Sequence, residues 1–346
     1  MITANPLVGV AFHAIGALSA SVCYAPQKKV IKWSWQSYFL AQALFCWLLL
    51  PILGAVLTIP NLAIVLAEAP RRAMMESFFL GMAYGIGGMA FNLAIRYIGF
   101  SLTYAIAVGL SSVLGTLIPP FVRGVLGETL NKPGAQWVVI GLVVGTIGIA
   151  LCGLAGRMKE QQLQGQGEFS LIKGLLLSLL AGILSAVYGF ALDAGQPIAE
   201  VALKHGAGVW QGNVIYIFSN SGAFITTAIF CVWLHIRQRT FSEFVAIRSE
   251  GHAGTLSINY LMAILTGMFW YGQFFFYNLG HVRMGAYKFT SWAIHMIMLV
   301  LFSNLLGLLL REWKGCRRNT LFAITVALSV LTLAILCLSY GNSLGQ

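Results

Sequence analysis

Three histidines and one aspartate lie in or at the ends of long apolar stretches, where ionisable side chains are rare. His13 lies in the first stretch, Asp193 ends the sixth, His281 ends the eighth and His295 lies in the ninth. A charge inside a membrane costs about 2.5–3.5 kcal/mol on insertion scales, so ionisable groups that remain there usually serve a function. Histidine exchanges protons near neutral pH. We therefore predict that these four groups are linked to proton movement. The alternative for each histidine is a hydrogen-bonded packing role.

An aromatic run with two amides occupies residues 269–278, FWYGQFFFYN. Sugars stack their C–H faces on aromatic rings and bind amide or imidazole groups through their hydroxyls, and this run supplies both kinds of group. Trp292 precedes His295 by three residues, so the two share a helix face. The candidate sugar contacts are Gln273, Tyr277, Asn278, Asn92, Trp292, Trp270 and Tyr24. The alternatives are a lipid-facing stripe for Phe274–Phe276, an interfacial belt for the tryptophans and helix–helix hydrogen bonds for the asparagines.

The elements that must position these groups follow from the composition. Of 346 residues, 58% are apolar and only 9% are charged, which excludes an ordinary soluble enzyme and a disordered chain. A spanning helix needs about 20 apolar residues. Ten such stretches are found, at 5–26, 38–59, 73–96, 101–123, 136–156, 172–193, 211–235, 257–280, 289–310 and 320–340. We expect an all-α polytopic membrane protein with ten transmembrane helices, because lipid leaves backbone groups to be satisfied within each segment.

The basic residues predict the orientation of these helices. The net charge is +11, and the basic residues of the sequence lie in short loops between apolar stretches. Such a distribution sets the orientation of a membrane protein, so nucleic-acid binding is not expected. The loops after the first, third, fifth, seventh and ninth stretches carry 14 Lys and Arg, against 7 in the other four loops. The first group is therefore expected in the cytoplasm and both termini outside. The first stretch is not a signal peptide, because no basic residue precedes it.

The two halves of the sequence resemble each other. Gly16–Ala20 in the first stretch matches Gly182–Ala186 in the sixth, and Phe91-Asn92-Leu93 in the third matches Tyr277-Asn278-Leu279 in the eighth. Five spans per half would insert the second half upside down, the inverted-repeat architecture of many secondary transporters. We expect a first five-helix repeat at 1–156, a polar linker at 157–171 and a second five-helix repeat at 172–346.

Motifs of other functional classes are missing from the sequence. No GxxxxGK[ST] phosphate loop occurs, so this chain is not expected to hydrolyse ATP or to require an ATPase subunit. The six cysteines form no CxxC pair, and we expect them to be packing residues rather than a metal site. No cofactor is expected beyond the proton as coupling ion. The alternative from another functional class is an integral membrane enzyme with histidines as catalytic bases. His13, His281 and His295 could supply three ligands to such a site, and Asp193 is the one carboxylate near them.

Several segments resemble the L-rhamnose–proton symporter family. They are His13–Gly16, Tyr24–Val30, Lys32–Trp35, Arg96–Gly99, Trp270–Tyr277, Gly280–Arg283, Ser291-Trp292, His295-Met296 and Arg311–Lys314. The resemblance covers nearly the whole chain in order. It implies ten spans, membership of the drug/metabolite transporter superfamily, and uptake of L-rhamnose, or of L-lyxose or L-mannose, coupled to proton entry.

The sequence also departs from that family. Asp193 stands where the family leads us to expect an amide, and Gln27 and Gln196 diverge, which suggests a shifted substrate preference. Other ten-span members of the superfamily often have cytoplasmic termini, whereas the loop charges favour termini outside the cell.

These observations together predict a secondary active transporter in the bacterial inner membrane, with periplasmic termini. His281, His295, Asp193 and His13 are the candidate proton-linked groups. The partners expected are a small sugar and the lipid bilayer, and the sequence leaves the oligomeric state open. The closest alternative is a proton-coupled porter or exporter of another small metabolite.

Overall fold

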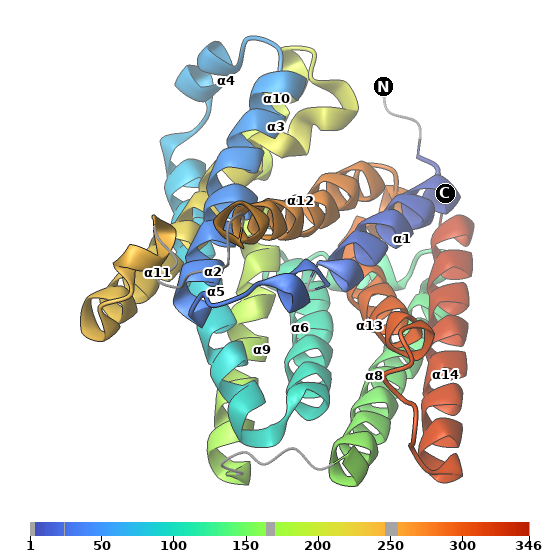
Figure 1. The fold of residues 1–346 in the computed structure, drawn as a ribbon. Coiled ribbons are helices and arrows are strands. Elements are labelled where there is room, and N and C mark those ends of the chain that lie inside the picture. Colours follow the sequence, from blue (N-terminus) through green and yellow to red (C-terminus); the bar gives the residue numbers. More distant parts are fainter. Residues whose placement is uncertain (1–3, 24, 164–169, 246–254, 346) are drawn as a thin grey trace. The chain divides into compact units, whose positions relative to one another are not determined.

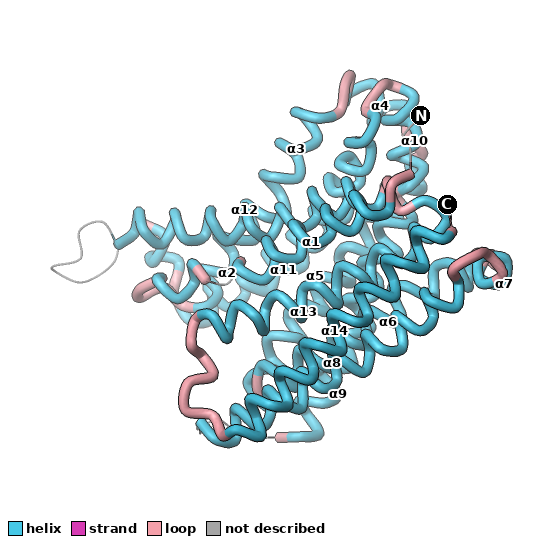
Figure 2. Tube along the Cα trace, turned by 90° about the vertical axis from the view of Figure 1, so that its right-hand side faces the viewer, coloured by secondary structure: helices cyan, strands magenta, loops and turns pink. Residues whose placement is uncertain are grey.

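The computed structural model describes residues 4–23, 25–163, 170–245 and 255–345. All regular structure in these ranges is helical (Figure 2). The α-helices are α1 (Pro6–Val22), α2 (Trp35–Ala43), α3 (Leu50–Thr58), α4 (Leu62–Glu68), α5 (Arg71–Ile98), α6 (Phe100–Val122), α7 (Leu126–Leu130), α8 (Ala135–Leu163), α9 (Leu171–Ala194), α10 (Gln196–Lys204), α11 (Ile215–Gln238), α12 (Thr255–His281), α13 (Ser291–Leu309) and α14 (Arg318–Leu344). A π-helical segment, Leu44–Leu49, joins α2 to α3, and short 3₁₀-helices cover Pro26–Lys29, Gly208–Val214, Phe241–Phe244 and Gly285–Thr290.

Helices cover each of the ten stretches expected to span a membrane, but the count of ten spans is not confirmed. Within the described ranges, nine helical segments are long and apolar enough to cross. α12 is the helix in an expected span that is not apolar enough to be counted among these segments, although its 27 residues would reach about 40 Å. Its amides and its indole and phenol groups lower the mean hydropathy below that of its neighbours. The same residues that make α12 a candidate binding helix therefore weaken its membrane signal.

The polar segment after the fifth stretch begins as helix. α8 continues to Leu163, which is seven residues into the range 157–171 expected as a linker. Lys, Glu, Gln and Met are good helix formers, so a helix emerging from the membrane has no reason to stop at its last apolar residue. Residues 164–169 lie outside the described part of the chain.

The chain, whose helices are labelled in Figure 1, divides into two compact units. Unit 1 comprises Met1–Ser21, Ile86–Phe190 and Phe276–Gln346, and unit 2 comprises Val22–Gly85 and Ala191–Phe275. Each unit therefore takes segments from both halves of the sequence. Four long helices, α1, α5, α9 and α12, contribute residues to both units.

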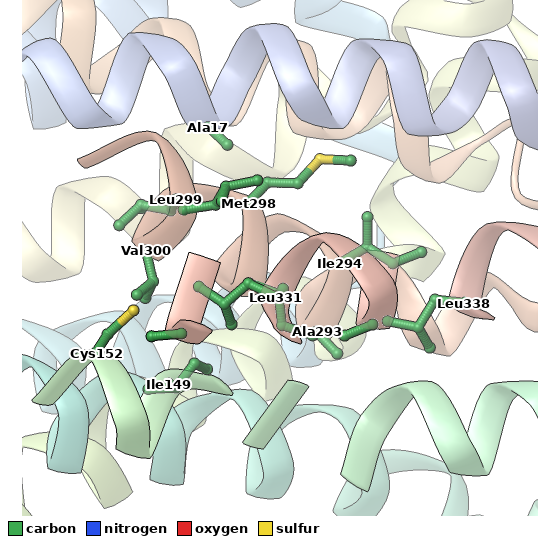
Figure 3. Packing of buried hydrophobic residues seen from close by; sticks show 14 of the residues in the cluster. Ala17, Ile149, Cys152, Ala293, Ile294, Met298, Leu299, Val300, Leu331 and Leu338 are labelled. Carbon is green, nitrogen blue, oxygen red and sulfur yellow. The ribbon is translucent and has the colours of Figure 1, made fainter. Parts of the chain in front are cut away.

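Unit 1 is built on three long helices that pack along one another. α8 packs along α14 and α6, and α13 contacts all three. A Cβ atom at Gly141 or Gly148 of α8 would lie 2.6 or 2.5 Å from the side chains of Leu338 and Leu331 of α14. Small residues at such contacts let membrane helices approach closely. The buried faces of α8, α13 and α14 form the core of the unit, shown in Figure 3.

Unit 2 is organised around α11, which contacts α2, the π-helical segment and α3. At the start of α2 the carboxylate of Glu243 accepts hydrogen bonds from the Ser34 backbone N–H (2.7 Å) and from the hydroxyls of Ser34 (2.8 Å) and Ser37 (2.5 Å). A carboxylate at a helix N-terminus satisfies backbone donors that have no partner within the helix. The loop after the seventh stretch is thereby fixed to the loop after the first.

Contacts between loops show which helix ends of unit 1 lie together, and they define two opposite ends of the unit. At the first end, which we call the Tyr97 end, the Ser170 backbone N–H donates to the Tyr97 carbonyl (3.2 Å), and the Arg317 N–H donates to the Gln162 side chain (2.8 Å). The loops after the third, fifth and ninth stretches therefore meet at this end. These are three of the five loops in the more basic group.

The second group of contacts defines the opposite end of α6 and α8, the Tyr287 end. The Asn5 backbone N–H donates to the Arg283 carbonyl (3.0 Å), the Tyr287 hydroxyl donates to the Pro133 carbonyl (2.8 Å), and Gly345 packs against the Tyr287 ring. The start of α1, the end of α14 and the loops after the fourth and eighth stretches therefore lie at one end of unit 1. α1 therefore begins, and α14 ends, at the Tyr287 end.

Candidate functional site

Five aromatic rings from three helices meet inside unit 1. They are His13 of α1, Tyr277 and His281 of α12, and Trp292 and His295 of α13, and we call them the ring cluster. The Tyr277 ring is at the centre. Its centroid lies 5.1 Å from that of His13, 5.5 Å from His295, 5.7 Å from His281 and 5.8 Å from Trp292. The His13 and His295 centroids are 6.0 Å apart. All five residues were candidates from the sequence.

Helical periodicity and one close helix contact assemble this cluster. Trp292 and His295, three residues apart on α13, both contact Tyr277, as expected for residues on one helix face. α1 reaches α12 at a pair of glycines. A Cβ atom at Gly280 would lie 2.8 Å from the Gly9 carbonyl oxygen and 2.9 Å from His13 Nε2. The missing side chain at position 280 therefore gives His13 its place beside Tyr277.

The cluster differs in exposure from one side to the other. His13 is fully buried and His295 is 2% exposed, whereas His281 is partly exposed at the end of α12. His281 stacks nearly parallel on Tyr277, at an interplanar angle of 14°, and its Nδ1 is 3.1 Å from the Ser291 hydroxyl. The histidines thus form a sequence from the more exposed Tyr287 end to the buried interior, with Tyr277 between them.

The position of Trp292 is fixed by α6. Its indole N–H donates to the Ser111 carbonyl oxygen (3.1 Å), with the Ser111 hydroxyl at 3.3 Å. A Cβ atom at Gly115 would lie 2.7 Å from the indole, and the Tyr188 ring of α9 is 6.0 Å away. Because the indole N–H is bonded to the protein, the ring faces are what Trp292 can offer to a ligand.

No pattern in the sequence predicts a role for Ser111 or Tyr188, and Ser185 is marked only as part of the repeated segment. Ser111 donates a hydrogen bond to Ser185 (3.1 Å), so these hydroxyls join α6 to α9 behind Trp292. Ser185 belongs to the segment Gly182–Ala186 that matches the first stretch, and that repetition was a signal for it. No local pattern distinguished Ser111 from the other hydroxyl residues of α6.

Polar atoms of the two buried histidines have unused hydrogen-bonding capacity. Within the described ranges, neither ring nitrogen of His13 has a hydrogen-bond partner, and neither does Nδ1 of His295. A neutral imidazole has one donor and one acceptor nitrogen, and a buried polar group without a partner costs about 1–3 kcal/mol. A ring nitrogen without a protein partner can hydrogen bond to a polar molecule or accept a proton.

The remaining candidates from the sequence lie elsewhere. Asn92 donates to the Gly88 carbonyl within α5 (2.9 Å), so its amide nitrogen serves its own helix. Asn278 is buried next to Tyr277 on α12. Trp270, Gln273 and Asp193 belong to unit 2.

In unit 2 the Trp270 ring is 6.2 Å from that of Trp47, Gln273 is buried, and Asp193 is partly exposed near the end of α9. Tyr24 lies outside the described residues. Within the described ranges, no group of three His, Cys, Asp or Glu side chains is placed to hold a metal ion.

A helical chain whose described residues include nine candidate spans and a buried cluster of polar rings is a polytopic membrane protein of the kind that includes secondary transporters. A model of the L-rhamnose-proton symport protein family matches residues 2–343. The chain therefore belongs to the L-rhamnose-proton symporter family, which is a family of transporters and not of enzymes.

Individual relatives agree with this family. The chain is 34% identical over 331 residues to the L-rhamnose-proton symporter of Mannheimia succiniciproducens, covering 95% of this chain and 96% of that protein. It is also 34% identical over 332 residues to that of Yersinia pestis, with the same coverage. A crystal structure described only as that of a protein aligns with a TM-score of 0.53 at 13% identity, over 95% of this chain and 96% of the other. That likeness concerns the fold alone.

Proposed function

We propose that this protein imports L-rhamnose together with protons, and that the ring cluster is the place where the two are coupled. The observation that carries the proposal is the near full-length similarity to proteins named L-rhamnose-proton symporters, combined with buried histidine nitrogens that have no partner in the described ranges. A buried imidazole beside an indole offers both a proton site and a stacking surface for a sugar.

The residues of the cluster divide these tasks. His281, His13 and His295 take the proton, and Tyr277 and Trp292 present ring faces to the sugar. At an effective dielectric constant of about 20, two unit charges about 6 Å apart repel by about 3 kcal/mol. Because the His13 and His295 rings are 6.0 Å apart, the pair is suited to one proton at a time. Asp193 is a fourth proposed proton-linked group, and Gln273, Asn278, Asn92, Trp270 and Tyr24 are further proposed sugar contacts.

The proposed architecture is ten transmembrane helices in two inverted repeats, 1–156 and 172–346, with α12 as the eighth span. Three of the five more basic loops meet at the Tyr97 end of unit 1, and the start of α1 and the end of α14 lie at the Tyr287 end, which supports alternating spans. Sugar and proton would bind together from outside. Loaded and empty forms then favour different conformations, which alternates access to the site.

Purified protein in liposomes is expected to couple sugar entry to proton entry. Adding L-rhamnose outside should raise the external pH, and this change should vanish when a protonophore is present. L-Lyxose, L-mannose and common hexoses in the same assay define the specificity. A protein that accumulates labelled L-rhamnose with no pH change, or that gives a pH change with none of these sugars, would contradict proton-coupled rhamnose symport.

The loop charges predict that the C-terminus is periplasmic in the bacterial inner membrane. Alkaline phosphatase, which is active only in the periplasm, is expected to be active when fused after Gln346. The matched fusion after Lys314, in the loop between α13 and α14, is expected to be inactive. The reverse pattern would place the Tyr287 end of unit 1 in the cytoplasm and contradict the proposed orientation.

A further inference from the structure

Unit 1 contains a cavity of about 80 Å³ that is separate from the ring cluster and lies toward the Tyr97 end. It is formed by α6, α8, α13 and the loop after α13. The lining residues that carry polar groups are Tyr104, Lys159, Ser303, Asn304, Glu312 and Trp313. At about 10–15 Å³ of such volume per water, the cavity has room for about six waters. One pyranose ring needs about that much space.

The charged groups of this cavity favour a neutral polar ligand. The Lys159 ammonium lies 3.8 Å from the Glu312 carboxylate and 4.8 Å from the centroid of the Trp313 ring. The Lys159 side chain is 19% exposed and that of Glu312 is 39% exposed. Because the two charges are opposite and adjacent, the pair has no net charge. A carboxylate and an ammonium side by side can bind the hydroxyls of a monosaccharide, and the part of the indole that lines the cavity can contact its C–H groups.

One face of α6 connects this cavity to the ring cluster. Tyr104 lines the cavity, and Ser111 accepts the hydrogen bond from Trp292. Residues seven apart lie on nearly the same face of an α-helix and about 10 Å apart along its axis. Val108 lies between them on that face and packs against the core of unit 1. The two sites are therefore successive positions along unit 1, from the Tyr287 end toward the Tyr97 end.

We propose that this cavity is a second monosaccharide site, at which the sugar binds after leaving the ring cluster and before release at the Tyr97 end. The inference rests on the proposed function, because it takes its ligand class from there. Lys159 and Glu312 bind hydroxyls of the sugar, and the indole of Trp313, which is 6% exposed, forms part of the wall that the sugar contacts. Both ionic groups are partly exposed, so binding is weaker here than at the ring cluster, as release requires.

The test follows two tryptophans in the full-length protein labelled with fluorotryptophan. Fluorine NMR signals of Trp292 and Trp313, assigned from the variants Trp292→Phe and Trp313→Phe, are recorded during titration with L-rhamnose. We expect both signals to shift, with Trp313 saturating at the higher sugar concentration. A Trp292 shift and a sugar-driven pH change without a Trp313 shift would overturn the second site and leave the proposed function intact. Absence of all three would reject the proposed function.

A matched pair of glycine variants tests whether the Trp313 response arises in the cavity. A Cβ atom at Gly307 would lie 3.2 Å from Trp313 Nε1 and 3.3 Å from Glu312 Oε2, whereas one at Gly88 would have no atom within 4 Å. We expect Gly307→Ala to lose the Trp313 shift and keep the Trp292 shift, and Gly88→Ala to keep both. A Trp313 shift of wild-type affinity in Gly307→Ala would overturn the proposal.

A second pair of variants tests the same point if Gly307→Ala does not fold. Lys159 and Lys173 both rest on aromatic rings, at 4.8 Å from Trp313 and 5.8 Å from Tyr97. Only Lys159 lines the cavity. Lys159→Met is expected to weaken the Trp313 response about tenfold, the effect of losing one hydrogen bond to a charged group. Lys173→Met is expected to leave the response unchanged, and equal effects in the two variants would overturn the second site.

Discussion

His295→Ala is expected to abolish sugar-driven proton uptake while the protein remains folded. His295 is 2% exposed, 5.5 Å from the Tyr277 ring and 6.0 Å from His13. Its Nδ1 has no hydrogen-bond partner among the described residues, so the substitution breaks no bond at that atom. What is lost is a group that can bind a proton beside the sugar. The measurement is the pH change on adding L-rhamnose to proteoliposomes, together with the melting temperature of the purified variant.

A cavity left by the missing ring could also impair transport, and His295→Gln separates the two causes. Glutamine fills much of the same space and forms hydrogen bonds but does not take up a proton. We expect His295→Gln to lack coupling as well. His205→Ala is the matched control, because His205 lies in unit 2 and pairs with Glu68 at 2.8 Å. Wild-type coupling in both His295 variants would remove this residue from the mechanism.

The positions of the helices were predictable because the bilayer imposes their length and composition. All ten apolar stretches are covered by helices in the structure, with ends shifted by a few residues. α12 is a helix like the others, but it is less apolar than they are. Its aromatic and amide residues were recognised as a candidate binding segment, and the same residues keep it out of the nine candidate spans found among the described residues. A helix rich in binding groups is less apolar, so the residues that mark α12 as a candidate binding helix also lower its hydropathy as a membrane span.

The candidate residues were predictable one at a time, but their grouping was not. Trp292 and His295 share a face through helical periodicity alone. Bringing His13 of α1 to Tyr277 of α12 depends on the contact between Gly9 and Gly280, which joins residues about 270 positions apart and leaves no local pattern. Trp270 and Gln273 stand in the same aromatic run as Tyr277, yet they belong to unit 2. A continuous run along one helix does not reveal where a compact unit ends.

The predicted equivalence of Asn92 and Asn278 in the two halves illustrates the same limit. Asn92 donates to the carbonyl of Gly88 in its own helix, and Asn278 is 5% exposed beside the ring cluster. A short repeated motif fixes the residue type and its place on a helix. Its hydrogen-bond partners depend on the packing around it, which the motif does not encode. The sugar contact proposed for each asparagine therefore needs its own test.

Gly280→Ala is expected to stop coupled transport through its effect on His13. The added methyl carbon would lie 2.8 Å from the Gly9 carbonyl oxygen, 2.9 Å from His13 Nε2 and 3.0 Å from its neighbouring ring carbon. The Gly9 oxygen belongs to the α1 backbone and has little freedom to move. Either α1 separates from α12 or the His13 ring turns away from Tyr277. Overpacking of this kind costs about 1–3 kcal/mol of folding free energy, so a folded but inactive protein is expected.

Gly88→Ala on α5 is the matched control, because its added carbon would have no atom within 4 Å and the change in backbone freedom is the same. Coupled uptake should be near the wild-type level in Gly88→Ala and absent in Gly280→Ala, with both proteins monodisperse and helical. Fluorine NMR of Trp292 adds a second measurement, because loss of the ordered Tyr277–His13 contact should alter its L-rhamnose response only in Gly280→Ala. Normal coupling in Gly280→Ala would show that the position of His13 beside Tyr277 is not required, and that the proton is carried by His281 and His295 without it.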